Sequence, residues 1–303
     1  MYPELLHLGP VTIYSFGVMA ALALVGAVTV GWLVMRTRGV PFDFAYELLF
    51  AAGIGGFAGA RLYYMFQHWT DVRADFWNSL VGGAGFTWYG GLAGGFLAVF
   101  AWSVVRKVPV GLVANAAGPG VAVGYAIGRI GCQLSGDGDY GKPSDLPWAM
   151  GYPHGTVPTP PGVTVHPTPV YETLVMFGVF ALLYWMAKRP RPGWYVFGWF
   201  LVLQGVERFL IEELRLNPVL ALGLTTPQFI GIASALAGIV VILVTRRRPT
   251  VEWRMGLAEV EGFPVPEAQA EPSPLERHAG KRKNGRPARR PAGPRRTTSR
   301  KKK

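Results

Sequence analysis

Seven apolar segments, separated by short polar loops, most constrain the fold of this 303-residue chain. Each is close to the roughly 20 residues that a helix needs to cross the hydrocarbon core of a bilayer. The composition agrees, with 50% hydrophobic residues and 40 glycines. We therefore predict an all-α, polytopic membrane protein with seven transmembrane helices, approximately at residues 11–35, 45–66, 86–105, 110–134, 170–187, 193–214 and 226–245.

Glycines at GxxxG spacing predict close contacts between these helices, because they let two backbones approach in lipid. The spacing occurs at Gly55/Gly59, at Gly90/Gly94 and at Gly120/Gly124/Gly128. We interpret most of these glycines as packing residues.

The basic residues of the short loops indicate how the chain crosses the membrane. One set of loops contains Arg36, Arg38, Arg106, Lys107, Lys188, Arg189, Arg191 and Arg246 to Arg248. On the other side the N-terminal segment has no basic residue, and the next two loops hold Arg73 alone and Lys142 alone. Because loops rich in Lys and Arg stay in the cytoplasm, we expect the N-terminus outside and the C-terminus in the cytoplasm. The loop at 135–168 is then periplasmic.

The net charge of +12 belongs to the end of the chain. Residues 277–303 hold 13 of the 30 basic residues and no acidic one, which leaves 17 basic against 18 acidic residues in the rest. We therefore predict a transmembrane domain at 1–245 and a disordered basic cytoplasmic tail at 246–303. Such a tail is attracted to anionic lipid. A nucleic-acid tail or a solvated tail without a role are the alternatives, and we expect no nucleic-acid partner.

Cysteine and histidine usage argues against a metal centre. Cys132 is the only cysteine, which excludes a disulfide within the chain, and we interpret it as a small packed residue. The five histidines include no HxxxH pair, and "DGDYGKPSDLPW" lacks the Gly and Glu that a calcium loop needs. We expect no metal site and no cofactor.

Ionisable residues within the apolar segments are the strongest functional signal, because such residues are costly in a bilayer. In the predicted topology most of them lie toward the outer side, namely Arg61, Arg129, Glu172, Glu207, Arg208, Glu212, Glu213 and Arg215. Arg208, Glu212 and Arg215 share one helical face, since their spacings are four and three. One interpretation is a set of buried ion pairs that orient the helices. We favour a pocket in which guanidinium groups bind the phosphate of a phospholipid head group.

Five stretches resemble the prolipoprotein diacylglyceryl transferases, which are enzymes of the bacterial inner membrane. They are "LGPVTIYSFGVM" at 8–19, "GFTWYGGLAGG" at 85–95, "GRIGCQLSGDGDYG" with "LPWAMGYP" to 153, "HPTPVYE" at 166–172 and "ERFLIEELR" at 207–215. Their order and spacing match over roughly residues 5–245. The GRxG loop, HPxxxYE and RFxxExxR together are specific, whereas each alone is a weak signal.

The resemblance implies transfer of the diacylglyceryl group from phosphatidylglycerol to the lipobox cysteine thiol of a prolipoprotein, the first step of lipoprotein maturation. It implies that Arg129 and Arg208 hold the phosphate and that Glu212 orients Arg208. His166 and Glu172 would shape the loop side of the pocket. The expected residues are Arg129, Arg208, Glu212, Tyr89 and His166 for catalysis, and Arg129, Arg208, Gly136, Asp137, Glu172 and Tyr14 for phosphatidylglycerol.

Several motif positions depart from the family's pattern, and the loss of the histidine, the tyrosine and the asparagine affects the side that would activate the thiol. Tyr89 stands where the family has the histidine proposed as base, Phe16 replaces a tyrosine, Cys132 replaces an asparagine, and Ser135-Gly136-Asp137 replaces NGE. The general base stays open among Tyr89, Tyr14, Asp137, Asp139 and His166. Alternative functions are a divergent paralogue that binds phospholipid but uses another acceptor or is inactive, and a small transporter.

Overall fold

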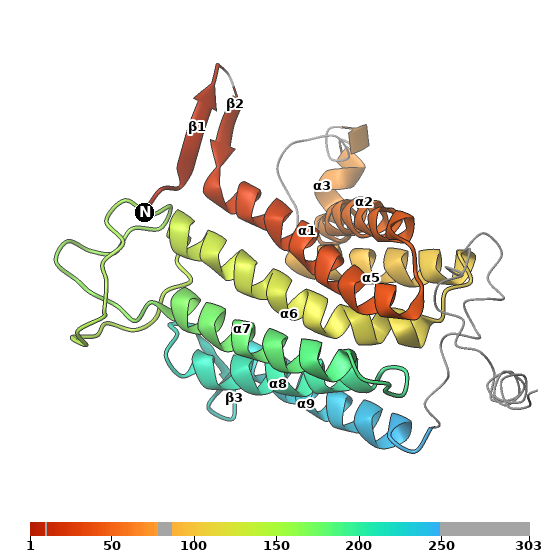
Figure 1. Ribbon diagram of the computed structural model, residues 1–303. Helices are drawn as coiled ribbons and strands as arrows, with labels where there is room; N and C mark the ends of the chain where they lie inside the picture. Colours follow the sequence, from red (N-terminus) through yellow and green to blue (C-terminus); the bar gives the residue numbers. More distant parts are fainter. Residues whose placement is uncertain (10, 75, 78–86, 249–303) are drawn as a thin grey trace, which may run out of the picture. The chain divides into compact units, whose positions relative to one another are not determined.

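Helices dominate the computed structural model, which describes residues 1–9, 11–74, 76–77 and 87–248 (Figure 1). Seven of the helices in these ranges are 18 residues or longer. They are α1 Ser15–Met35, α2 Phe42–Gln67, α5 Trp88–Val105, α6 Val110–Ser135, α7 Thr168–Ala187, α8 Tyr195–Glu212 and α9 Thr226–Thr245. The shorter ones include η1 Arg36–Arg38 and α3 Trp69–Ala74. The seven predicted segments coincide with the long helices to within a turn at either end. The predicted tail from residue 249 onward lies outside the described residues.

Two small antiparallel hairpins correct the all-α prediction. They are β1 Glu4–Leu8 with β2 Val11–Tyr14, and β3 Val219–Ala221 with β4 Leu224–Thr225. The first four residues of the first predicted span are therefore a strand, as the β-branched side chains in "VTIY" favour. The second hairpin turns at Leu222 and Gly223, whose φ angles of 52° and 75° are those of a two-residue hairpin turn.

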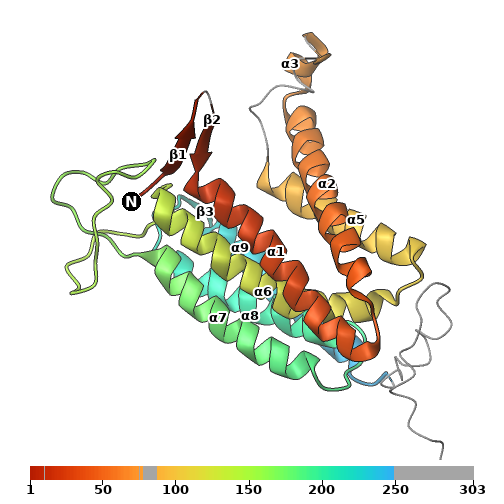
Figure 2. The same cartoon turned by 45° about the horizontal axis from the view of Figure 1, so that its top comes forward.

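The helix α6 lies at the centre of the helical part of the chain. It packs against α1, α7 and α8, while α2 pairs with α5 and α8 pairs with α9 (Figures 1 and 2). In the most apolar stretch of α6, 67% of the residues are buried. The corresponding shares for α1, α2, α7 and α9 are 17% to 22%. Most residues of α6 are therefore enclosed by neighbouring helices.

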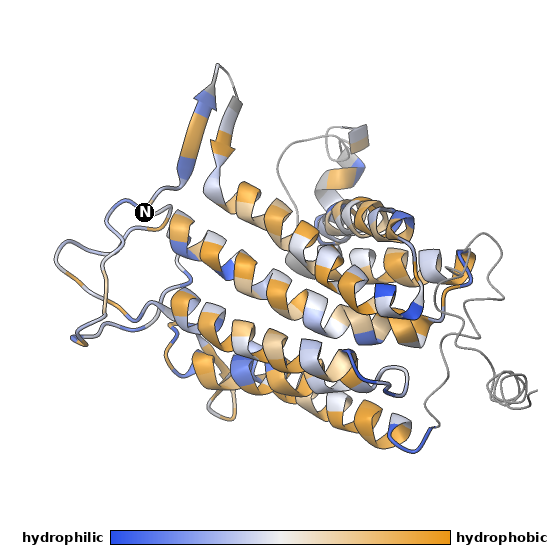
Figure 3. Cartoon of the chain, viewed as in Figure 1, coloured by the Kyte–Doolittle hydropathy of each residue, from blue (hydrophilic) through white to orange (hydrophobic). Residues whose placement is uncertain are grey.

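The other helices expose apolar surface, which requires a lipid environment. Five helices, α1, α2, α6, α7 and α9, are long and apolar enough to cross a membrane. In α5 the apolar stretch is shorter, Gly90–Val105, and α8 carries three charged residues, Glu207, Arg208 and Glu212. The long helices are predominantly orange, the colour of apolar residues, in Figure 3. Large side chains such as Phe66 and Leu174 are 76% and 67% exposed. The chain is therefore a multi-pass membrane protein.

The GxxxG glycines bring helix backbones into contact, as predicted. A Cβ atom on Gly59 of α2 would lie 2.7 Å from the Cα atom of Gly94 in α5, so neither position accepts a side chain without separating the helices. Gly120 of α6 meets the Ala27 carbonyl oxygen of α1 in the same way, at 2.5 Å. Gly128 differs, because no atom lies within 4 Å of an added Cβ. The packing interpretation is therefore wrong for Gly128.

A buried asparagine fixes α8 relative to α6 and so determines where their charged residues meet. The Nδ2 atom of Asn115 donates to the Pro192 carbonyl at 2.8 Å, and the Val196 amide donates to Asn115 Oδ1 at 2.9 Å. Both helices begin near this contact and rise about 1.5 Å per residue. Measured along the helix axes, Arg129 then lies about 21 Å beyond Asn115 in α6, and Arg208 lies about 18 Å beyond Val196 in α8. The two arginines therefore lie at nearly the same height.

Candidate functional site

Six charged side chains form a cluster where α6 and α8 end and α7 begins. They are Arg129 of α6, Asp139 of the following loop, Glu172 of α7, Arg208 and Glu212 of α8, and Arg215 just after α8. Their exposed side-chain fractions range from 0% for Glu172 and Glu212 to 31% for Asp139. Ion pairs in such a setting lose little strength to solvent screening. We call these six residues the arginine–carboxylate cluster.

Glu172 is the buried centre of this cluster. Its Oε2 atom accepts a hydrogen bond from Tyr125 Oη at 2.5 Å and lies 2.6 Å from Arg129 Nε, and its Oε1 atom accepts from Arg215 Nη1 at 3.2 Å. Tyr125 also accepts from Arg129 Nη2 at 2.9 Å, and its ring lies 5.0 Å below that guanidinium group. One carboxylate thus orients two arginines from different segments.

Asp139 bridges the same two arginines from the loop side. One of its carboxylate oxygens accepts from Arg129 Nη1 and the other from Arg215 Nη2. Burial opposes ionisation of this carboxyl group, but the two guanidinium groups outweigh burial and hold the pKa of Asp139 below its usual value. The Thr168 hydroxyl donates to the Asp139 carbonyl oxygen at 2.5 Å, which ties the loop to the start of α7.

Arg215 reaches the cluster because its backbone is joined to the loop that follows α6. Gly141 and Arg215 form an isolated antiparallel bridge, and the Lys142 amide donates to the Leu214 carbonyl at 2.7 Å. The Lys142 ammonium group also donates to the Glu213 carbonyl oxygen at 2.7 Å. From the sequence Arg215 could be placed on the face of Glu212, but no role of its own was predicted for it. Its spacing of three from Glu212 is the signal that points to it.

Arg208 and Glu212 form the second part of the cluster. Arg208 Nη2 lies 3.0 Å from Glu212 Oε2, while Glu212 Oε1 accepts from Asn217 Nδ2 at 2.6 Å and from the Thr225 hydroxyl at 3.0 Å. Arg208 therefore has a fixed partner, which is the arrangement that the predicted orienting role of Glu212 needs. Its Nη1 atom is buried and has no hydrogen-bond acceptor among the described residues. That donor is available to a substrate oxygen.

Arg129 and Arg208 are linked indirectly. They share no carboxylate in the described part of the chain, and Arg215 connects them because it contacts Glu172 and lies 4.0 Å from Glu212 Oε2. The three guanidinium groups thus form one connected network at the end of the central helices.

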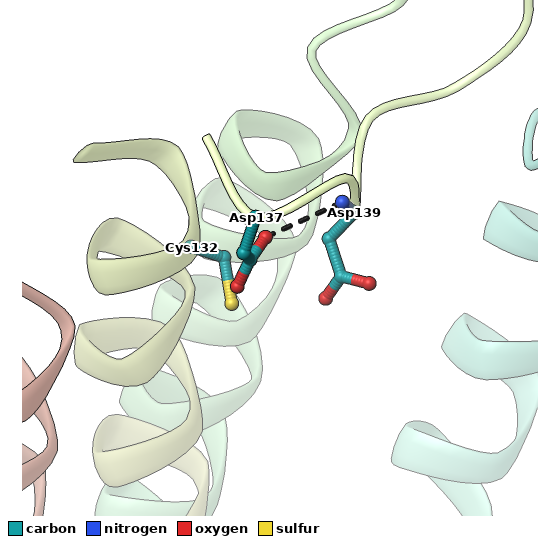
Figure 4. Close-up of side chains that lie close together, drawn as sticks. All are labelled: Cys132, Asp137 and Asp139. Carbon is teal, nitrogen blue, oxygen red and sulfur yellow. Dashed lines mark hydrogen bonds between the residues drawn. The ribbon is translucent and has the colours of Figure 1, made fainter. Parts of the chain in front are cut away.

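Gly136 and Asp137 lie next to this network, where α6 ends. Gly136 has a φ of 60° and donates its amide to the Cys132 carbonyl at 2.9 Å, and a Cβ atom there would lie 2.7 Å from the Cα atom of Gly155. Both features require glycine. The carboxylate of Asp137 lies beside the thiol of buried Cys132 (Figure 4). Burial, and then the charge of Asp139, raise the pKa of Asp137.

The Cys132 sulfur and one carboxylate oxygen each of Asp137 and Asp139 lie within 4.8 Å of one another. This is the spacing of metal ligands, but a cation would have to compete with two guanidinium groups for Asp139. The two guanidinium groups therefore disfavour a metal ion at this position.

Comparison with known proteins identifies the family. The profile of the family described as prolipoprotein diacylglyceryl transferase matches residues 3–244. The chain belongs to this family. Similar proteins, each named phosphatidylglycerol–prolipoprotein diacylglyceryl transferase, occur in Chromohalobacter salexigens (33% identity over 270 residues, 84% of this chain and 97% of the relative), Clostridium tetani (30% over 251 residues, 82% and 99%) and Bordetella avium (30% over 263 residues, 81% and 95%). The resemblance drawn from the motifs is therefore confirmed.

The structure describes the surroundings of His166 and Tyr14, two further residues that the family resemblance assigned to the site, but not the side chain of the third, Tyr89. His166 is half-buried, and its Nδ1 atom lies 3.4 Å from the Tyr171 hydroxyl, which accepts from Trp148 Nε1 at 2.7 Å. Tyr14 ends β2 and is 55% exposed. Neither contacts the cluster within the described residues. Tyr89 is the second residue of α5, and its side chain lies outside the described part of the structure.

Two further side chains lie near the cluster, half-buried Tyr125 and buried Glu207. Tyr125 lies one turn before Arg129, and this spacing of four is the only sequence feature that relates them. Glu207 precedes Arg208 and is 7% exposed, and neither of its carboxylate oxygens has a hydrogen-bond partner among the described residues. Glu207 was recognisable from the sequence as an ionisable residue within a span, but no role was predicted for it.

Proposed function

We propose that this chain transfers the diacylglyceryl group of phosphatidylglycerol to the lipobox cysteine thiol of prolipoproteins, the first step of lipoprotein maturation. The relatives carry both substrates in their names, and the family match includes every residue of the arginine–carboxylate cluster. The observation that carries the proposal is this cluster of three guanidinium groups at the ends of apolar helices. Charged side chains are costly in a membrane protein, so a cluster of this kind is expected either to form ion pairs between segments or to bind an anion.

We further propose seven membrane spans in the bacterial cytoplasmic membrane, with the N-terminus outside and the C-terminus in the cytoplasm. Two of the three charged residues of α8 do not argue against its spanning, because Arg208 and Glu212 neutralise each other. The basic residues Arg36, Arg106 and Lys188 follow the ends of α1, α5 and α7. The cluster lies at the opposite ends of the helices, which favours a site near the outer leaflet.

In the proposed reaction the arginines bind and then stabilise the phosphate. The thiolate sulfur of the acceptor attacks the glyceryl carbon that carries the phosphate ester, so a carbon–sulfur bond forms as the carbon–oxygen bond breaks. Glycerol phosphate leaves with the bonding electrons and gains negative charge. Arg129 and the free Nη1 donor of Arg208 are our candidates to stabilise that charge, with Glu212 and Glu172 holding the guanidinium groups in place.

The thiol must also lose a proton, and Asp137 is our candidate to accept it. Asp139 is a poor base, because two guanidinium groups hold its pKa low. The pKa of Asp137 is instead raised by burial, and its carboxylate lies at the edge of the cluster. Tyr89, Tyr14 and His166 remain the other candidates. If Asp137 is the base, Asp137→Asn lowers kcat and removes the acidic limb from the pH profile of kcat.

A second function is favoured by the replaced motif positions Phe16, Tyr89 and Cys132. A paralogue that binds phospholipid but uses another acceptor, or none, would keep the arginines and lose the residues around the thiol. Phe16 is the second residue of α1 and is 46% exposed, and it has no hydroxyl group where a tyrosine would have one. This alternative predicts lipid binding without transfer.

Transfer is tested with purified protein in liposomes that contain phosphatidylglycerol and a lipobox peptide, with the mass of the peptide as readout. We expect the mass of one diacylglyceryl group to be added, and no addition in liposomes of phosphatidylcholine alone. Arg129→Ala should abolish transfer. The control variant Arg106→Ala should not, because Arg106 pairs with Glu47 outside the arginine–carboxylate cluster. Full activity of Arg129→Ala would reject the phosphate assignment. Lipid binding without transfer, together with failure to rescue a strain depleted of its own transferase, would favour the paralogue.

A further inference from the structure

The carboxylate of Asp139 occupies the arginine pair in the way that a phosphodiester would. Each of its two oxygens contacts a different guanidinium group, Arg129 on one side and Arg215 on the other. A phosphodiester also presents two non-bridging oxygens that share one negative charge, and arginine binds carboxylate and phosphate with the same fork of donors.

The charges around this pair leave no place for a second anion while Asp139 stays. Arg129 and Arg215 carry two positive charges, and Glu172 and Asp139 carry two negative charges against them. Adding a phosphodiester would leave a buried negative charge without a partner, which is strongly unfavourable. Removing Asp139 from the pair leaves one positive charge, which matches the single negative charge of a phosphodiester.

Of the two carboxylates, Asp139 is the one that an incoming lipid meets first. Its side chain is 31% exposed, whereas that of Glu172 is completely buried and also bonded to Tyr125. The backbone of Asp139 is held at both ends, by the Thr168 hydroxyl at its carbonyl oxygen and by Asp137 Oδ1, which accepts its amide at 3.3 Å. A turn of the side chain alone therefore clears the arginines and leaves the loop in place.

We propose that Asp139 is a built-in competitor for the phosphate site, which the phosphodiester of the lipid displaces from Arg129 and Arg215. The identity of this lipid as phosphatidylglycerol rests on the proposed function. Without lipid, Asp139 keeps the two guanidinium groups paired, so that they are never buried without a counter-charge. After transfer, its return to the arginines helps to expel glycerol phosphate. The lowered pKa of Asp139 agrees with this role, because the competitor stays ionised at neutral pH.

The test compares wild-type protein with Asp139→Asn and Asp139→Ala, and with Asp145→Asn as a matched control. Asp145 is an exposed carboxylate of the same loop, so its replacement changes the loop charge equally. Binding of dioctanoyl phosphatidylglycerol and of inorganic phosphate is measured by calorimetry in detergent solution, without acceptor peptide. We expect both Asp139 variants to bind the lipid on the order of tenfold more tightly than wild type. Asp145→Asn should bind it as wild type does.

Comparing phosphatidylglycerol with inorganic phosphate shows whether the site binds any phosphate group or only that of the lipid. Tighter binding of both means that any phosphate enters the site, and tighter binding of the lipid alone means that the site accepts only the lipid. In the transfer assay the Asp139 variants should lower both KM for phosphatidylglycerol and kcat, because product leaves more slowly. Unchanged or weaker lipid binding in both variants overturns the proposal, even where wild-type transfer supports the proposed function. Failure of both variants to give monodisperse protein also overturns it, since Asp139 would then be a structural bridge.

Discussion

Replacing Glu172 by glutamine tests whether the arginine–carboxylate cluster holds the helices together. The carboxylate of Glu172 is fully buried and contacts Arg129 at 2.6 Å, Arg215 at 3.2 Å and Tyr125 at 2.5 Å. Removing one partner of a buried ion pair costs about 3–5 kcal/mol, because the other charge stays buried. Glutamine keeps one acceptor oxygen, which recovers about 1 kcal/mol as a neutral hydrogen bond. We therefore expect Glu172→Gln to lower the free energy of unfolding by about 3 kcal/mol.

The matched control is Glu47→Gln, the same chemical change outside the cluster. Glu47 pairs with Arg106 at 2.9 Å and accepts from Trp102 Nε1 at 3.0 Å, but 26% of its side chain and 37% of that of Arg106 are exposed. Such a pair contributes about 0–1 kcal/mol. Unfolding by sodium dodecyl sulfate in mixed micelles, followed by tryptophan fluorescence, gives both values. Equal losses for the two variants would refute the idea that Glu172 balances two buried guanidinium groups.

Four further predictions concern single groups. Glu207→Gln should leave the free energy of unfolding unchanged or raise it, because both carboxylate oxygens are buried without a partner in the described chain; a clear loss in the same unfolding assay would reveal a partner. Arg208→Lys should lower kcat/KM for phosphatidylglycerol at least about tenfold, because lysine keeps the charge but loses the free Nη1 donor; activity equal to wild type would count against that donor. The pKa of Asp139 is lowered on folding, so its contribution to stability is complete above the unfolded value of about 3.9 and disappears as pH falls below it; unfolding measured from pH 7 to pH 3 should show this loss, and Asp139→Asn should reduce it. Gly59→Val should cost about 1–3 kcal/mol by separating α2 from α5, whereas Gly128→Ala, in open space, should cost nothing; similar losses for both would contradict the packing argument.

The helices could be predicted from the sequence because the bilayer sets their length. In lipid, a segment of about 20 apolar residues satisfies all its backbone hydrogen bonds by forming a helix, so the bounds of the helix follow from those of the apolar segment. The paired glycines at Gly59 and Gly94 were predictable for the same reason, since close approach in lipid needs residues without side chains. The strand at Val11–Tyr14 was not, because four apolar residues adjoining a longer apolar run read equally well as helix or strand.

The contacts of the cluster were predictable only in part. Glu212 with Arg208 follows from a spacing of four on one helix. The bridge from Asp139 to Arg215 does not, because 76 residues separate the two and their meeting depends on the pairing of Gly141 with Arg215. Motif reasoning likewise grouped Tyr14 and His166 with the arginines, although one ends an exposed hairpin and the other contacts Tyr171. Their assigned roles stay predictions, as does that of Tyr89.

The origin of the cluster in five successive parts of the chain has a consequence during synthesis. Arg129, Asp139 and Glu172 leave the ribosome well before Arg215, which is their last partner. A nascent chain that ends between residues 172 and 208 therefore has the carboxylates of Asp139 and Glu172 against the single guanidinium group of Arg129. The second guanidinium partner of these carboxylates arrives only with Arg215, so this part of the cluster is not neutral until that residue has been made.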